Sequence, residues 1–261
     1  TSGVEGLAIT GNAVFGNAAG DFVGNTAALE FVTVTGTTTF NAGNGAGAVN
    51  TVRTTGIQTY TGAVTLGAAT TITSDSIPGT PAIDGATPGN DVTFTSTING
   101  ANSLAINTAG TTSLNGAIGG TTPLTSLTTD AVGTTSIGAG TINLNGSTGT
   151  FNDAVLLTTA NLTITEAGTG NVTFAAALDS AAGNFTLTVN TTGGGNTIFG
   201  GAVGSGAVAG SVVGLGSVTT DAAGSTAINC GVVKTTGAQT YNDTGTIGAG
   251  GAGVTTLTST G

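Results

Sequence analysis

Most side chains in this chain that can act as acids, bases or metal ligands are carboxylates. Twelve Asp and Glu residues are spread over 261 residues, with a single cysteine, Cys230, and no His. Without His there is no Ser-His or Cys-His pair and no cluster of the usual zinc ligands. We therefore expect no catalytic, metal-binding or cofactor-binding residue of these kinds.

Carboxylates alone could still serve a polysaccharide-active β-helix. Such enzymes need clustered acids beside Arg or Lys on one face, and the only cations are Arg53 and Lys234. The scatter of the acids predicts that the protein is not an enzyme and leaves polysaccharide cleavage a minor alternative. The acids are Glu5, Asp21, Glu30, Asp75, Asp84, Asp91, Asp130, Asp153, Glu166, Asp179, Asp221 and Asp243.

Four of these acids occupy repeated phrases. Asp130 and Asp221 lie in equivalent TTDA phrases, and Asp153 and Asp243 follow Asn in equivalent phrases. Carboxylates at tight corners can bind calcium, but Asp and Asn also stabilise corners by hydrogen-bonding their own backbone. Because no GGxGxD nonapeptide occurs, we favour the corner interpretation and keep calcium as an alternative.

The overall composition excludes several classes of partner. A net charge of -10 with two cations opposes nucleic-acid binding. No run of 18 or more apolar residues is present, so no helical membrane span is expected. The low charge content and 38% hydrophobic residues argue against a disordered chain.

The elements that must position these side chains are strands. Gly and Thr recur too often for helices, and short stretches rich in β-branched residues alternate with Gly, Asn and Asp. The phrase VRTTGIQTY at 52–60 recurs as VKTTGAQTY at 233–241, with a weaker copy, NLNGSTGTFND, at 143–153. Equivalent residues Tyr60, Phe151 and Tyr241 are 91 and 90 residues apart (151 − 60 and 241 − 151). A module of about ninety residues is therefore repeated.

A shorter phrase recurs inside the module, each copy beginning with a large apolar residue. We call these eleven residues the anchor positions, and their mean step is (241 − 15)/10, about 23 residues. We expect them to stack as one core ladder. They are Phe15, Phe40, Tyr60, Phe94, Leu114, Ile137, Phe151, Phe174, Phe199, Ile228 and Tyr241.

Units of this size bury a core only by stacking on their neighbours. The sequence therefore predicts an all-β protein with one continuous β-solenoid over residues 1–261, a rod of about eleven coils. It would contain three imperfect modules, approximately 1–100, 101–183 and 184–261. Tandem β-sandwich domains of about ninety residues are the alternative, opposed by the shorter period and the lack of Trp and paired cysteines.

The phrase TTGIQTYTGAVTLGAATTIT at 54–73 resembles the repeat arrays of large bacterial surface proteins, the filamentous-haemagglutinin-like and autotransporter-like adhesins. The resemblance implies a right-handed parallel β-helix on a bacterial surface or in an extracellular fibre. It implies a role as stalk, adhesin shaft or filament subunit. An adhesin surface that binds a glycan or a host protein is the alternative function.

The two ends of the sequence fall inside the repeat pattern, and neither supplies a capping element. Exposed strand edges recruit other chains unless charge, Pro or a covering element blocks them. We therefore expect either head-to-tail self-association or continuation of a longer array.

Three smaller expectations concern single residue types. Arg53 and Lys234 should occupy an outward-facing position that accepts any polar residue. Cys230 should be a small residue near a corner, with a crosslinking thiol as the alternative. Thr-x-Thr at 33–35 and 71–73 raises ice binding, a minor alternative because such patterns do not recur at one place in every coil.

Overall fold

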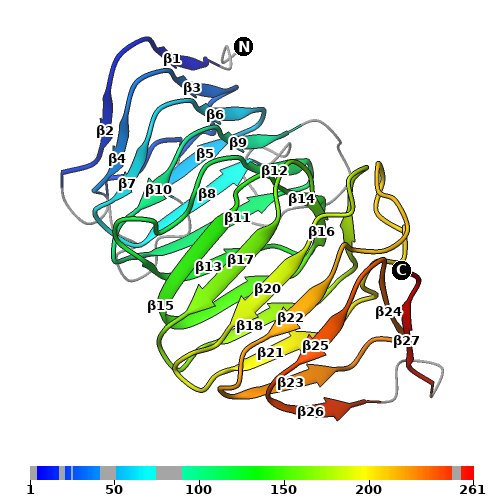
Figure 1. Ribbon diagram of the computed structural model, residues 1–261. Helices are drawn as coiled ribbons and strands as arrows, with labels where there is room; N and C mark the ends of the chain where they lie inside the picture. Colours follow the sequence, from blue (N-terminus) through cyan, green and yellow to red (C-terminus); the bar gives the residue numbers. More distant parts are fainter. Residues whose placement is uncertain (1–4, 18–20, 25, 42–50, 75–89, 249–253) are drawn as a thin grey trace.

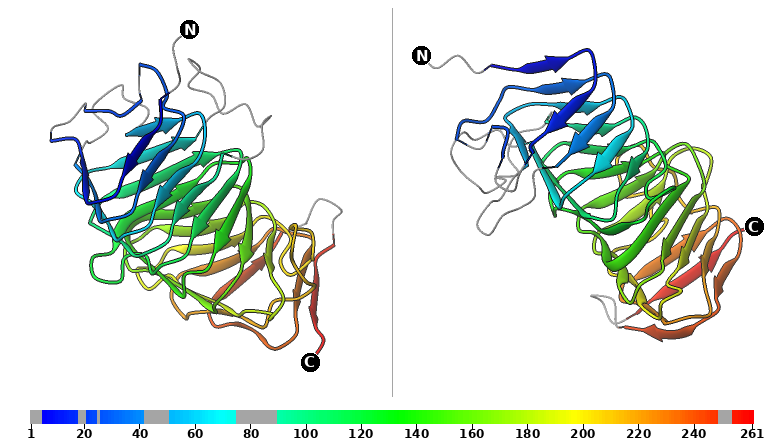
Figure 2. Two further views of the ribbon diagram at one scale, coloured as in Figure 1. Left: turned by 90° about the horizontal axis from the view of Figure 1, so that it is seen from above. Right: turned by 90° about the vertical axis from the view of Figure 1, so that its left-hand side faces the viewer.

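The computed structural model is a β-solenoid whose coils each pass through three sides built of parallel strands (Figure 1). It describes residues 5–17, 21–24, 26–41, 51–74, 90–248 and 254–261. All elements in this part of the chain are strands, and none of these residues forms a helix able to cross a membrane. The views in Figure 2 show the strands stacked along one axis from the N-terminus to the C-terminus.

Side 1 runs the whole length of the rod. Its strands are β1 (Leu7–Ile9), β3 (Val32–Val34), β6 (Gln58–Tyr60), β9 (Val92–Phe94), β12 (Thr111–Leu114), β14 (Thr134–Ile137), β16 (Ala154–Leu157), β19 (Leu178–Ser180), β24 (Val232–Thr235) and β27 (Thr256–Ser259). An isolated bridge residue, Val203, joins β19 to β24.

Side 2 follows side 1 in each coil. Its strands are β2 (Ala13–Phe15), β4 (Thr38–Phe40), β7 (Val64–Leu66), β10 (Ile98–Asn99), the first part of β15 (Thr141–Phe151), β17 (Leu162–Glu166), β20 (Leu187–Asn190), β22 (Val218–Thr220) and β25 (Gln239–Tyr241). Ile118 bridges β10 and β15.

Side 3 completes each coil. Val23 bridges to its first strand. The strands are β5 (Val52–Thr54), β8 (Thr70–Ser74), β11 (Ser103–Thr108), β13 (Leu124–Thr129), the second part of β15, β18 (Asn171–Phe174), β21 (Asn196–Phe199), β23 (Ser225–Ile228) and β26 (Thr244–Ile247).

The pairing register on side 1 counts the coils. One inward-facing position can be followed through eleven rungs, so the described chain makes ten circuits with a mean step of (257 − 7)/10, or 25 residues. Those rungs are Leu7, Val32, Gln58, Val92, Thr112, Thr135, Val155, Leu178, Val203, Val233 and Leu257. The predicted β-solenoid is confirmed, with about ten coils, and the sandwich alternative is wrong because the strands pair in parallel from coil to coil.

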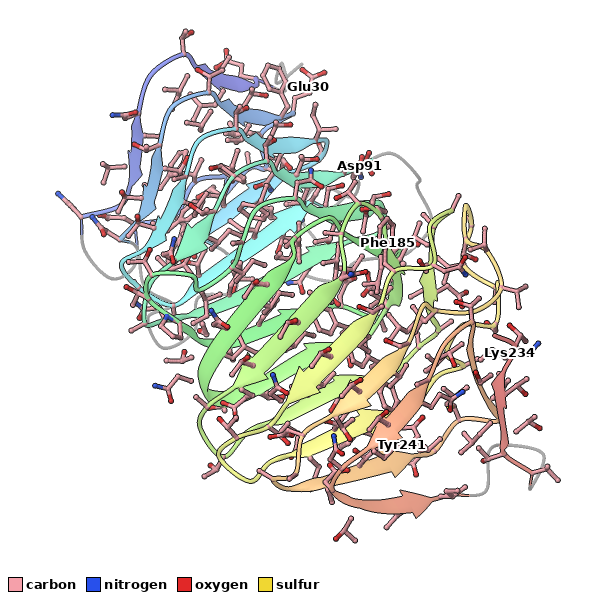
Figure 3. All side chains as sticks on the ribbon, in the orientation of Figure 1. Glu30, Asp91, Phe185, Lys234 and Tyr241 are labelled. Atoms are coloured by element: carbon pink, nitrogen blue, oxygen red, sulfur yellow. The ribbon has the colours of Figure 1, made fainter. Side chains whose placement is uncertain are left out.

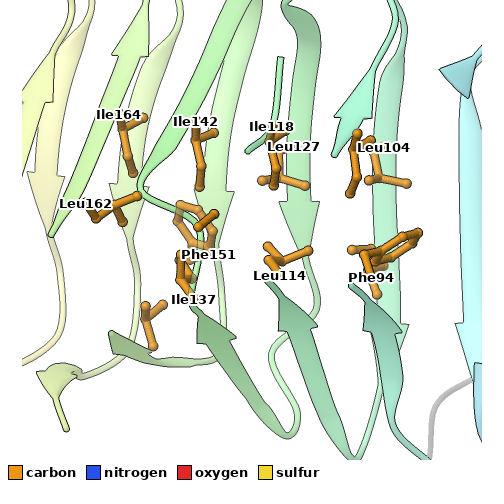
Figure 4. Close-up of a cluster of buried hydrophobic side chains, with 14 of the residues drawn as sticks. Phe94, Leu104, Leu114, Ile118, Leu127, Ile137, Ile142, Phe151, Leu162 and Ile164 are labelled. Atoms are coloured by element: carbon orange, nitrogen blue, oxygen red, sulfur yellow. The ribbon is translucent and has the colours of Figure 1, made fainter. Parts of the chain in front are cut away.

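The core fills the space between the three sides. Inward side chains alternate with outward ones along each strand, and the buried apolar residues form one continuous cluster (Figure 4). Aromatic rings stack in two runs, with centroids 5.0 to 5.8 Å apart: Phe15, Phe40, Tyr60 and Phe94, then Phe151, Phe174 and Phe199. Such contacts add to the burial of the rings themselves.

The anchor positions do not form the single ladder that we expected. Ten are buried and Tyr241 is half-buried, but the pairing register divides them among the three sides. Phe15, Phe40 and Tyr241 lie on side 2; Tyr60, Phe94, Leu114 and Ile137 on side 1; Phe151, Phe174, Phe199 and Ile228 on side 3. All three sides obey the same inside-outside rule, so the sequence phrase passes from one side to another, and its mean step underestimates the coil.

The ninety-residue module is likewise not a whole number of coils. Its equivalent residues Tyr60, Phe151 and Tyr241 lie on side 1, side 3 and side 2, respectively. At 25 residues a coil, ninety residues make three coils and about two further sides. Each module therefore repeats its local structure on a different side of the rod. The three module boundaries themselves remain predictions.

Candidate functional site

The phrase VRTTGIQTY builds a hydrogen-bonded corner between side 3 and side 1. The Gln58 side chain is fully buried, and its Nε2 donates to Thr54 Oγ1 at 3.1 Å and to the Thr73 carbonyl of the next coil at 2.8 Å. The Tyr60 hydroxyl donates to Gln58 Oε1 at 2.8 Å. The Thr54 hydroxyl donates to the Gly56 carbonyl at 2.6 Å. The corner thus satisfies a buried amide that would otherwise be costly.

The phrase VKTTGAQTY builds the same corner one side further round, between side 1 and side 2. Gln239 Nε2 donates to Thr235 Oγ1 at 3.3 Å and to the Thr258 carbonyl of the next coil at 2.9 Å. The Tyr241 hydroxyl donates to Gln239 Oε1 at 3.2 Å. Near-identical phrases recur because each forms a corner that joins two sides and two coils.

The middle copy of the phrase has lost this network. Gly149 stands where the other copies have Gln, and a Cβ there would lie 2.7 Å from the Leu144 side chain. Leu144 is buried and takes the space that the glutamine fills elsewhere. An apolar filling and a polar network are therefore two solutions for the same kind of corner.

A second repeated corner holds an aspartate. Asp153 is 2% exposed and accepts hydrogen bonds from the hydroxyls of Thr129 at 2.6 Å and Thr135 at 2.8 and 2.9 Å. Asp243 accepts from Thr220 at 3.1 Å and from Thr226 at 2.8 and 2.9 Å. The residue before each aspartate, Asn152 or Asn242, donates to the carbonyl of Thr129 or Thr220 at 2.7 Å.

The TTDA aspartates tie one coil to the coil before it. Asp130 Oδ1 accepts the Thr108 amide at 3.0 Å, and Asp221 Oδ1 accepts the Thr191 amide at 2.9 Å. We expected such residues to stabilise corners through their own backbone, but these bonds reach the backbone of a neighbouring coil. Local turn rules missed them because the partner lies 22 or 30 residues away.

Two further acids are fully buried, which the sequence analysis did not foresee. Glu166 accepts the amides of Gly146, Gly168 and Gly170 at 2.9 to 3.0 Å. Asp179 accepts the amides of Gly206 and Val208 at 3.1 and 2.8 Å. The glycines two and four residues after Glu166 were the one sequence signal for its site. Backbone amides stabilise an ionised carboxylate without any cation.

The acids do not gather into a candidate active site. Among the described residues no three His, Cys, Asp or Glu side chains are placed to hold a metal ion. Asp75 and Asp84 lie outside the described residues. No family model, curated protein or solved structure matches the chain. The functional argument therefore rests on the geometry of the rod.

The two cations occupy different environments. Arg53 in β5 is 5% exposed, so the expectation of a solvent-facing side chain is wrong for it, whereas Lys234 in β24 is half-buried. Figure 3 places Lys234 and Tyr241 near the C-terminal end of the rod. Cys230 is buried, and burial raises the pKa of its thiol. A buried thiol with a raised pKa is poorly suited to crosslinking.

The last rung of each side is exposed. Leu257 on side 1 and Ile247 on side 3 are 43% and 64% exposed, and Tyr241 on side 2 is half-buried. The preceding rungs, Val233 and Ile228, are 0% and 3% exposed. Apolar inward positions therefore end without a covering coil in the described residues.

One outward column on side 2 consists of threonines in five successive coils. Four are half-buried and the last is exposed, and none of their hydroxyls makes a hydrogen bond with another described residue. The pattern recurs in five coils, which the irregular sequence spacing had hidden, but not in all ten. The column is Thr141, Thr163, Thr188, Thr219 and Thr240.

The two glutamine corners offer a matched test of the buried network. Gln58→Ala leaves the Tyr60 hydroxyl and the Thr73 carbonyl buried without their partner, so we expect a loss of about 3 kcal/mol in unfolding free energy. Gln239→Ala, in the half-buried copy, should cost about 1 kcal/mol because water replaces the lost bonds. Urea unfolding of both variants checks this. Equal losses would contradict the assigned role of burial.

The aspartate corner predicts an unusual pH dependence. Burial raises the pKa of Asp153 to about 6; its two threonine partners oppose the shift and the Asp130 charge adds to it. The unfolded chain loses this proton near the ordinary value of 3.8, so it binds fewer protons than the folded chain between the two values. The free energy of unfolding should therefore fall as pH rises from about 4 to about 7.

Asp153→Asn should remove on the order of 2 kcal/mol of that fall. Asn152→Ala is the control, because it removes an adjacent hydrogen bond but keeps the carboxylate. Denaturant unfolding at a series of pH values measures both. An unchanged pH dependence in Asp153→Asn would show that this carboxyl keeps its ordinary titration.

Proposed function

We propose that this chain is a non-enzymatic structural repeat protein, the shaft or filament subunit of a bacterial surface or extracellular fibre. The observation that carries the proposal is the course of the three ladders, which run through the rod and end in exposed apolar residues. A surface of this kind is suited to the next coil of a rod.

The use of polar groups supports the same role. The buried side chains Gln58, Asp153, Glu166 and Asp179 all bond to neighbouring backbone or side chains, which joins corners and coils. Catalytic groups would instead converge on a shared cleft. The resemblance to bacterial adhesin repeats places the rod at the cell surface, with a glycan or protein receptor as an alternative role of its outward faces.

Self-association of the chain tests the proposal. We expect rods that lengthen with concentration in steps of about 50 Å, since each copy contributes eleven rungs spaced about 4.8 Å apart. Light scattering and electron microscopy measure this. Ile247→Asp should block growth by placing a charge on the last rung, whereas Val213→Asp, at an exposed valine away from the ladder ends, should not. A monodisperse monomer at high concentration would refute the filament form.

A second candidate function, ordering of water as in ice binding, is favoured by the threonine column on side 2. Its hydroxyls are unused within the described chain and recur at the spacing of adjacent strands, about 4.8 Å. An array of free hydroxyls at such a regular spacing can hold water molecules in fixed positions.

Ice recrystallisation assays test this candidate. The unmodified chain should inhibit recrystallisation, and Thr188→Lys should abolish the effect by interrupting the column. Leu156→Lys, at an outward position on side 1, should leave inhibition intact. Absence of inhibition by the unmodified chain would eliminate the candidate.

A further inference from the structure

Both ends of the rod leave core residues incompletely covered. Six apolar residues pack against the core while only partly buried, and all but Phe185 belong to the first coil or the last. These five are Leu7, Ile9, Val23, Leu29 and Tyr241. The first coil and the last coil are thus each half of an inter-coil contact of the kind repeated throughout the rod.

The C-terminal end has the form of a spiral step. The strands that have no following partner are β25 on side 2, β26 on side 3 and β27 on side 1. Because β27 already covers β24, side 1 has one more rung than the other two sides. The next free place along the spiral is therefore above β25.

The N-terminal end begins the spiral with β1 on side 1, then β2 on side 2 and Val23 on side 3. A second copy that kept its sides aligned would put β1 above β27. The places above β25 and β26 would then each lack a strand. A copy turned by one side puts β1 above β25, β2 above β26 and Val23 above β27, with no strand missing.

We propose that a second copy of this chain docks its first coil on the C-terminal end, turned by one side about the rod axis. This inference rests on the proposed filament function and specifies its contact. The same turn is already found inside the chain, where the glutamine corner recurs one side further round.

The inward residues match in this arrangement. Leu7 and Ile9 would cover Gln239 and Tyr241, as Val92 and Phe94 cover the equivalent Gln58 and Tyr60 within the chain. Phe15 would cover Ile247, a pair like Phe199 and Ile228, and Val23 would cover Leu257. Every exposed last rung therefore receives an apolar partner.

The charges favour this head-to-tail contact over contact between two N-terminal ends. The first thirty residues carry Glu5, Asp21 and Glu30 and no cation, whereas residues 232–261 carry one cation, Lys234, and one acid, Asp243. Two N-terminal ends would bring six carboxylates together. The N-terminal end against the C-terminal end avoids that repulsion.

Cysteine crosslinking tests the register. In a Cys230→Ala background, one chain carries Ala8→Cys and a second, tagged chain carries Thr240→Cys. These outward residues of β1 and β25 would lie on adjacent strands, about 4.8 Å apart, within the reach of a disulfide. Matched chains carry Thr258→Cys or Thr246→Cys, the corresponding outward positions of β27 and β26.

We expect oxidation to give a mixed dimer with Thr240→Cys, at least tenfold more than with either matched chain, on nonreducing electrophoresis. Preferential crosslinking to Thr258→Cys or Thr246→Cys would overturn the turned register. Self-association seen by light scattering without any of these crosslinks would overturn the contact but not the filament. Absence of self-association would refute both. Circular dichroism verifies that each variant folds.

Discussion

The fold depends on in-register stacking of each coil on the one before it. A parallel ladder gives every strand the same backbone partners on both edges, so any residue that fits one coil must also fit its two neighbours. The runs of stacked rings from Phe15 to Phe94 and from Phe151 to Phe199 satisfy that condition with apolar contact. The buried Gln58 and Asp153 satisfy it with hydrogen bonds.

The same constraint explains how a chain so poor in cations tolerates buried acids. Glu166 and Asp179 are fully buried, and they accept backbone amides from corners of adjacent coils. Glycine is needed where two corners come close. Gly133 and Gly224, equivalent residues of the TTDA phrases, have φ angles of 84° and 72°, and a Cβ at either would lie within 2.2 Å of a carbonyl oxygen. Acid and glycine together therefore tie successive coils.

The architecture was readable from the sequence, whereas the register was not. Strand-forming residues and repeated units too small to fold alone predicted a solenoid, and inside-outside alternation identified ten buried anchor positions. Their assignment to one ladder failed because the step from Phe40 to Tyr60 changes side rather than completing a coil. The buried sites of Glu166 and Asp179 were missed because their partners are backbone amides, which leave little trace in side-chain sequence.

The central claim is that the ninety-residue module steps round the rod, so that three nearly equivalent sides share one local code. An experimental structure at a resolution that assigns side chains is the most direct test. It should place Tyr60, Phe151 and Tyr241 on three different sides, with Phe151 paired to Phe174 and Tyr60 paired to Phe94. A structure in which Tyr60, Phe151 and Tyr241 lie on the same side, each separated by a whole number of coils, would contradict the account.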